Sequence, residues 1–134
     1  MAGIQSLVGV TVLTLAMQAV WTVVGPKPPP IIVHDLRYED GYIVQDRTIT
    51  SDGPFKAIWS SEILNKATGD IVQGCTGSGV WDYEAGHKAP RIPLAEWVGN
   101  AACDLGPGVY IPIASYSAGE FHMIARGDEF DVAR

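Results

Sequence analysis

The first part of the chain lacks charged side chains altogether. No Asp, Glu, Lys or Arg precedes Lys27, so the formal net charge of -6 belongs to the rest of the 134 residues. An acidic domain of this kind repels a phosphate backbone, which argues against nucleic-acid binding. The uncharged stretch 4–24 is apolar and about twenty residues long, and as a helix it would span about 30 Å, the thickness of a bilayer core. We therefore expect a single transmembrane helix within residues 1–25.

The same segment also lacks the features of a removable signal peptide. No basic residue precedes the apolar run. A cut after Ala16 would come too early, and a cut after Gly25 would place Pro26 in the blocking position. We expect an uncleaved signal anchor, with a secreted binding protein that loses its signal peptide as the alternative.

The positions of two side chains in the predicted helix suggest how they would interact with the membrane. Trp21 lies near its far end, where an indole ring fits the membrane interface. Gln18 is polar, and it either reaches headgroup depth or hydrogen-bonds a neighbouring helix. Both interpretations of Gln18 stay open.

Cysteine is scarce, with Cys75 and Cys103 the only two. An even count that follows an export-like segment favours one disulfide over two free thiols. Because disulfides persist outside the cytoplasm, we expect the N-terminus to be cytoplasmic and the C-terminal domain periplasmic or extracellular. Between the predicted helix and the C-terminal domain, residues 26–30 read Pro-Lys-Pro-Pro-Pro. This run predicts a stiff polyproline II spacer.

Helix-length amphipathic patterns are missing after residue 30, and apolar residues recur with a period of two. Trp59 and Trp81 are predicted to point into the core, as is Cys75. Pro112 lacks a ladder donor and should move its strand to an edge or a bulge. About seven short strands predict an antiparallel β-sandwich over residues 31–134. The predicted strands are 31–36, 42–50, 55–63, 71–81, 91–97 (a strand or a single helical turn), 109–116 and 120–126.

Residues 104–110, Asp-Leu-Gly-Pro-Gly-Val-Tyr, add a more specific signal. They resemble the L-x-P-G-x-Y entry to the penultimate strand of immunoglobulin-like and fibronectin type III-like domains. The resemblance implies that Tyr110 is a tyrosine-corner residue, whose hydroxyl bonds to the backbone of the preceding turn. The cysteines depart from that pattern, because the familiar bridge joins the second and sixth strands, whereas Cys75 lies in the fourth predicted strand.

Motifs that would demand catalysis are also lacking. Residues 74–79, Gly-Cys-Thr-Gly-Ser-Gly, match neither a nucleophile elbow nor a phosphate-binding loop. Asp82, Glu84 and His87 are close in sequence, but their spacing matches neither an EF-hand nor a zinc motif. We expect a solvated acidic loop there, with a metal-dependent hydrolase as the less favoured alternative.

These observations together predict a protein that is not an enzyme and needs no cofactor. We expect a membrane-anchored accessory, structural or recognition subunit of a larger membrane or virion assembly, of a kind common in bacteria and phages. It would act through protein-protein contacts, and the sequence points to no small-molecule substrate.

Overall fold

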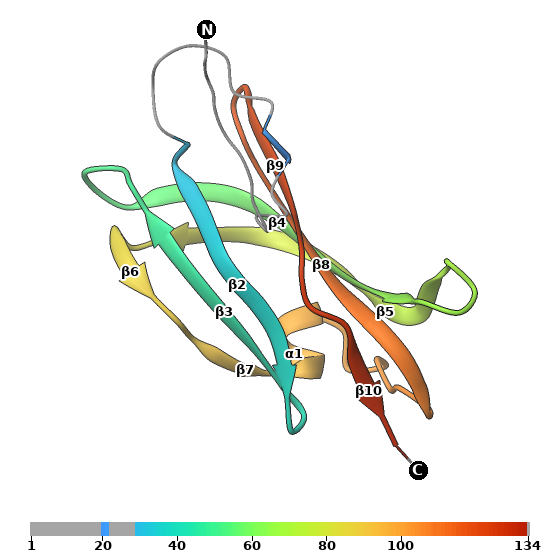
Figure 1. Ribbon diagram of the computed structural model, residues 1–134. Helices are drawn as coiled ribbons and strands as arrows, with labels where there is room; N and C mark the ends of the chain where they lie inside the picture. The colour runs from blue at the N-terminus through green and yellow to red at the C-terminus, as the bar shows by residue number, and fades with distance from the viewer. Residues whose placement is uncertain (1–19, 22–28, 134) are drawn as a thin grey trace, which may run out of the picture.

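The described part of the chain is an antiparallel β-sandwich. A computed structural model describes residues 20–21 and 29–133, and Figure 1 shows their two facing sheets. The larger sheet has the order β1-β9-β8-β4-β5, with β10 also paired to β8. Its strands are β1 (Val20–Trp21), β4 (Phe55–Asn65), β5 (Ile71–Tyr83), β8 (Gly108–Ala118), β9 (Phe121–Arg126) and β10 (Phe130–Val132).

The smaller sheet is built around one central strand. β3 (Tyr42–Ile49) pairs with β2 (Ile31–Glu39) on one side, and with β6 (Gly86–Lys88) and β7 (Arg91–Pro93) in succession on the other. Asp40 and Gly41 join β2 to β3, and both have positive φ, as the tight turns of hairpins require. The short helix α1 (Leu94–Val98) follows β7 and packs against both sheets.

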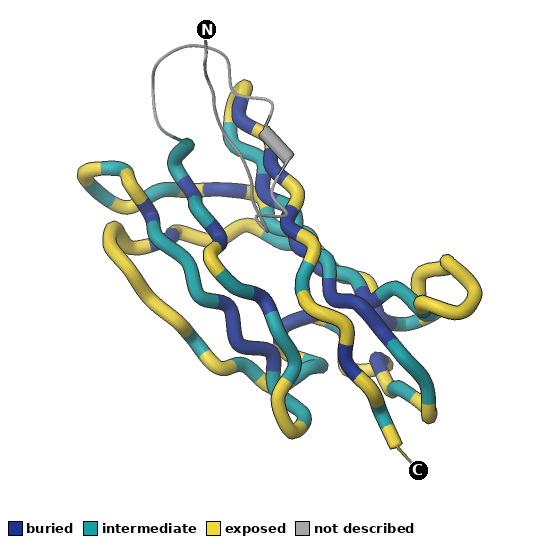
Figure 2. The backbone as a smooth tube through the Cα atoms, viewed as in Figure 1, coloured by how far each residue is buried: buried dark blue, intermediate teal, exposed yellow. Residues whose placement is uncertain are grey.

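The core lies between the two sheets, as the dark blue segments in Figure 2 indicate. β9 illustrates the cause: Phe121, Met123 and Ala125 are buried and the residues between them are exposed. Each large apolar side chain buried in this way contributes about 1.5–3 kcal/mol. The period of two that predicted the sandwich is therefore the alternation that fills its core.

The strands that were not predicted are short. β6 and β10 have three residues each, and every residue of β6 is exposed. A segment of three residues is too short to carry a periodic signal, and its conformation depends on pairing with β3 or β8. Residues 91–97 contain both alternatives left open by the sequence, because β7 leads directly into α1.

Of the two alternatives predicted for Pro112, an edge strand or a bulge, the edge strand is wrong. Pro112 is buried in β8, which has β4 on one side and β9 and β10 on the other. Its carbonyl accepts the N–H of Gly127, which lies between β9 and β10. Because a residue points its carbonyl and N–H to the same side, the missing donor faces this break in the neighbouring strand. A central strand tolerates the proline for that reason.

The predicted transmembrane segment falls almost entirely outside the described residues, Gln18 included. Val20 and Trp21 are described, and they form a strand rather than a helix, paired with Ile124 and Met123 of β9. No helix in the described ranges, 20–21 and 29–133, is long and apolar enough to cross a bilayer.

The last two residues of the predicted spacer contact the sandwich. Thr50 donates its N–H to the carbonyl of Pro30 at 3.0 Å and its hydroxyl to the carbonyl of Pro29 at 2.7 Å. Pro29 and Pro30 are thus tied to the end of β3. The rest of the spacer lies outside the described residues.

Candidate binding pocket

A pocket of about 440 Å³ lies between the sheets, beside β5. β5 is the last strand of the larger sheet, so one of its edges has no strand partner among the described residues. Most of the lining is aromatic or aliphatic, with a few polar groups. The lining residues are Gln45, Arg47, Trp59, Ser60, Ser61, Trp81, Tyr83, Pro90, Ile92, Glu96, Trp97 and Tyr116.

Glycines in β5 bring the other walls close to this strand. A Cβ atom added to Gly77 would lie 1.8 Å from the carbonyl oxygen of Val98 in α1. A Cβ on Gly79 would lie 3.0 Å from the ring of Trp59. The absence of side chains at these positions lets α1 and the indole pack directly on the strand.

Trp81 is not the core residue that the sequence predicts. It pairs with the buried Ala57, so it lies on the inner face of the sheet, yet 59% of it is exposed. The edge position of β5 explains the difference, because the smaller sheet does not cover it. Trp81 therefore forms a wall at the mouth of the pocket. Trp59, one strand further in, is partly buried against the core, as expected.

One buried hydrogen bond fixes the inner wall. The indole N–H of Trp97 in α1 donates to the side-chain oxygen of Gln45 in β3 at 3.0 Å, and both residues are buried. A buried polar group without a partner would be costly, so this bond ties α1 to the smaller sheet in one position.

Arg47 is the one cation among the lining residues that the structure describes. Its guanidinium carbon lies 5.0 Å from the centre of the Tyr83 ring, within the range of a cation–π contact. Its Nε is buried and has no hydrogen-bond partner in the described part of the chain, and no ion pair there includes Arg47. The guanidinium is held by an aromatic ring, and its charge has no ion-pair partner within the described residues.

The two tyrosines of the pocket stay neutral at physiological pH. Burial raises the pKa of Tyr83 to about 12, although the nearby charge of Arg47 opposes the rise. Burial also raises the pKa of Tyr116, whose ring lies edge-on to that of Tyr83 with 5.8 Å between the centroids.

Asp82, Glu84 and His87, the weak candidates for a metal site, do not converge on one point. Among the described residues, no group of three or more His, Cys, Asp or Glu side chains is placed to hold a metal ion. Each of the three instead has its own partner: Asp82 with Lys56 at 3.9 Å, Glu84 with Lys88 at 3.0 Å, and His87 with Asp46 at 2.5 Å. The Lys88 hydrogen bond lowers the pKa of Glu84.

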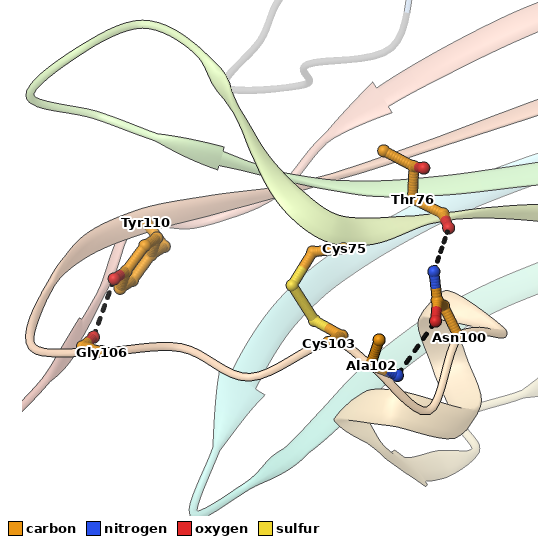
Figure 3. The surroundings of a disulfide bond; sticks show 7 residues. All are labelled: Cys75, Thr76, Asn100, Ala102, Cys103, Gly106 and Tyr110. Atoms are coloured by element: carbon orange, nitrogen blue, oxygen red, sulfur yellow. Dashed lines mark hydrogen bonds between the residues drawn. A yellow bond between two sulfur atoms is a disulfide. The ribbon is translucent and has the colours of Figure 1, made fainter.

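The disulfide and the tyrosine corner are both present, as Figure 3 shows. Cys75 and Cys103 are bonded, which joins β5 to the loop between α1 and β8. The Tyr110 hydroxyl donates to the carbonyl of Gly106 at 2.7 Å, the bond implied by the resemblance at residues 104–110. Asn100 reaches the carbonyl of Thr76 at 3.5 Å. The loop that supports α1 is thus held to β5 beside the pocket.

The sequence reasoning missed Gln45, Arg47 and Trp97. A signal for the first two was present, because they lie on the same face of β3 as Ile43 and Ile49, which are buried. Polar residues at inward positions of a strand mark a site that needs partners. Trp97 carried no such signal, since its role depends on where α1 packs.

Comparison of the chain with protein-family models, with curated proteins and with solved structures finds no match.

Proposed function

We propose that this protein is a non-enzymatic recognition module, an accessory or structural subunit of a larger membrane or virion assembly, which binds a protein partner at the pocket between its sheets. The observation that carries the proposal is the combination of half-exposed Trp81 with Arg47, which has no ion-pair partner in the described chain. Tryptophan, tyrosine and arginine are the residue types that dominate binding energy at protein interfaces.

The chemistry of the lining supports binding rather than catalysis. Ser60 and Ser61 are its hydroxyl-bearing aliphatic side chains, and the lining contains no histidine to serve as their base. Arg47 and Glu96 are its charged residues. Such a set is suited to orienting a bound group.

The proposed location follows from the sequence and the disulfide. The uncharged span within residues 1–25 supports a signal anchor, of which Val20 and Trp21 would not be part because they pair with β9. The Cys75–Cys103 bond supports a periplasmic or extracellular domain. The tyrosine corner and the packing of a smaller sheet around β3 against a larger one support a sandwich of the immunoglobulin-like or fibronectin type III-like kind.

Photo-crosslinking in the native membranes or particles tests the proposal. A photoreactive phenylalanine placed at Trp81 should crosslink to a discrete protein, whereas the same group at Ile58, which is exposed on the outer face of β4, should not. Trp81→Ala should also reduce co-isolation of the crosslinked protein, because it removes one wall of the pocket.

A companion variant tests the hydrolase alternative. Replacing Asp82, Glu84 and His87 together by alanine leaves the pocket lining intact, so partner binding and biological activity should persist. Equal crosslinking from positions 81 and 58 would count against the proposed site. Loss of activity in a folded triple variant would favour the hydrolase.

A further inference from the structure

The pocket has room for an aromatic residue, because an apolar cavity of about 150 Å³ already accommodates benzene. Its volume of about 440 Å³ lies at the lower end of the range for ligand pockets, about 300–1,000 Å³. Trp59, Trp81 and Tyr83 provide flat apolar walls, which favour an aromatic ring by stacked or edge-on contacts. A single ring attached to a short linker fits this space.

Arg47 specifies what the ring should carry. The charge of Arg47 has no ion-pair partner within the described residues, and a carboxylate can accept two parallel bonds from a guanidinium. Tyr83 already holds the guanidinium in the pocket, so little side-chain freedom is lost when an anion binds. Glu96, the other charged lining residue, is exposed and would repel an anion. The carboxylate therefore belongs on the Arg47 side.

Among the standard residues of a protein chain, only a C-terminal aromatic residue carries both a ring and a carboxylate. In an extended segment, neighbouring side chains point to opposite faces, so an aromatic residue and an adjacent acidic residue cannot both enter. A C-terminal aromatic residue joins ring and carboxylate through a few bonds. The edge of β5 next to Trp81, which has no strand partner among the described residues, also offers backbone groups to an approaching extended chain.

We infer that the pocket binds the C-terminal aromatic residue of a partner chain, with its ring against the tryptophans and its carboxylate on Arg47. The inference rests on the proposed function and specifies the partner of the same site. It differs from that proposal in requiring a free carboxylate.

Binding of matched peptides to the full, disulfide-bonded chain tests the inference. The probe is acetyl-Thr-Ser-Thr-Ser-Thr-Phe with a free C-terminus, compared with the same peptide as its C-terminal amide and with 3-phenylpropionate. Kd values come from the NMR shifts of the indole N–H groups of Trp59, Trp81 and Trp97. The free acid should bind about tenfold or more tightly than the amide, since it adds a charge-assisted bond.

Variants assign the preference to Arg47. Arg47→Met should bring the acid and amide to nearly equal Kd values, and Arg47→Lys should keep part of the difference, because the charge remains without the fork. Ile58→Ala, on the outer face, should change neither value. If Arg47→Met does not fold, Arg47→Lys carries the test.

Three results would overturn the inference. Equal binding of acid and amide would remove the role of the carboxylate, and absence of binding by every probe would remove the terminal residue as ligand. Phenylpropionate binding as tightly as the peptide acid would identify a free aromatic acid as the ligand. In each case the Trp81 crosslinking experiment decides separately whether the pocket still binds a protein.

Discussion

Tyr83 and Tyr116 are the titratable residues that burial perturbs most strongly. An unfolded tyrosine has a pKa near 10, whereas burial raises the pKa of Tyr83 to about 12 and also raises that of Tyr116. Below pH 10 the two tyrosines are protonated in both the native and the unfolded state, so they cause no change in stability with pH. Between pH 10 and about 12 the unfolded chain loses the protons that the native state keeps, so the free energy of unfolding falls as pH rises.

The first prediction is therefore a loss of stability at alkaline pH. Tyr83 alone should lower the free energy of unfolding by roughly 2–3 kcal/mol between pH 10 and 12. Each pH unit in that interval lowers it by about 1.4 kcal/mol. Urea unfolding at pH 9 and pH 11.5 measures the change. Tyr83→Phe should weaken the pH dependence, and Tyr42→Phe, outside the pocket lining, serves as the control. Identical pH dependence in the two variants would show that Tyr83 is not the residue responsible.

At the scale of elements, the contact between β5 and α1 determines the shape of the pocket. The helix is only five residues long, and its backbone lies against Gly77. A helix of this length is not stable by itself, so its position depends on β5, on the Trp97–Gln45 bond and on the disulfide-linked loop that follows.

The second prediction concerns Gly77→Ala. The new methyl group would overlap the Val98 carbonyl and force α1 away from β5, which should lower the free energy of unfolding by about 1–3 kcal/mol. Urea denaturation gives the stability, and the indole N–H shift of Trp97 reports the movement of α1. Gly53→Ala is the matched control, because no atom lies within 4 Å of its added Cβ. Equal stability of the two variants would contradict this account of the β5–α1 contact.

At the scale of the whole molecule, the disulfide joins an edge strand to the loop that precedes β8. Cys75 is fully buried and is separated from Cys103 by 28 residues along the chain. Closing a loop of that length removes unfolded-state entropy worth roughly 3.6 kcal/mol in the chain-entropy model. A domain of this size has a total stability of about 5–15 kcal/mol, so the bond is a large share of it.

The third prediction is that Cys75→Ser with Cys103→Ser lowers the melting midpoint by several degrees or more. The double alanine variant separates the loss of the bond from the cost of burying serine hydroxyls. Thermal unfolding followed by circular dichroism measures both variants. Recovery of two free thiols from protein isolated without reductant would contradict the disulfide and weaken the proposed location outside the cytoplasm.

The positions of the longer strands and the tyrosine corner were predictable from sequence because both depend on local pattern. Alternation along a strand fixes which residues face the core, as β9 illustrates, and residues 104–110 place the Tyr110 hydroxyl close to Gly106. The disulfide followed from arithmetic, since two cysteines allow one pairing. The membrane anchor is a prediction of the same local kind and stays a prediction.

The pocket was decided by tertiary structure. Alternation along β5 places Trp81 on the inner face of the larger sheet. Only the order of the strands makes β5 the last strand of that sheet, where the smaller sheet does not cover Trp81. The partners Gln45 and Trp97, and the ring that holds Arg47, come from separate elements brought together by the packing of two sheets and a helix. Side-chain period is a property of each strand alone, whereas exposure and contact depend on which strands are neighbours. The sequence by itself therefore determined the sandwich, and the assembled sheets decided where it can bind.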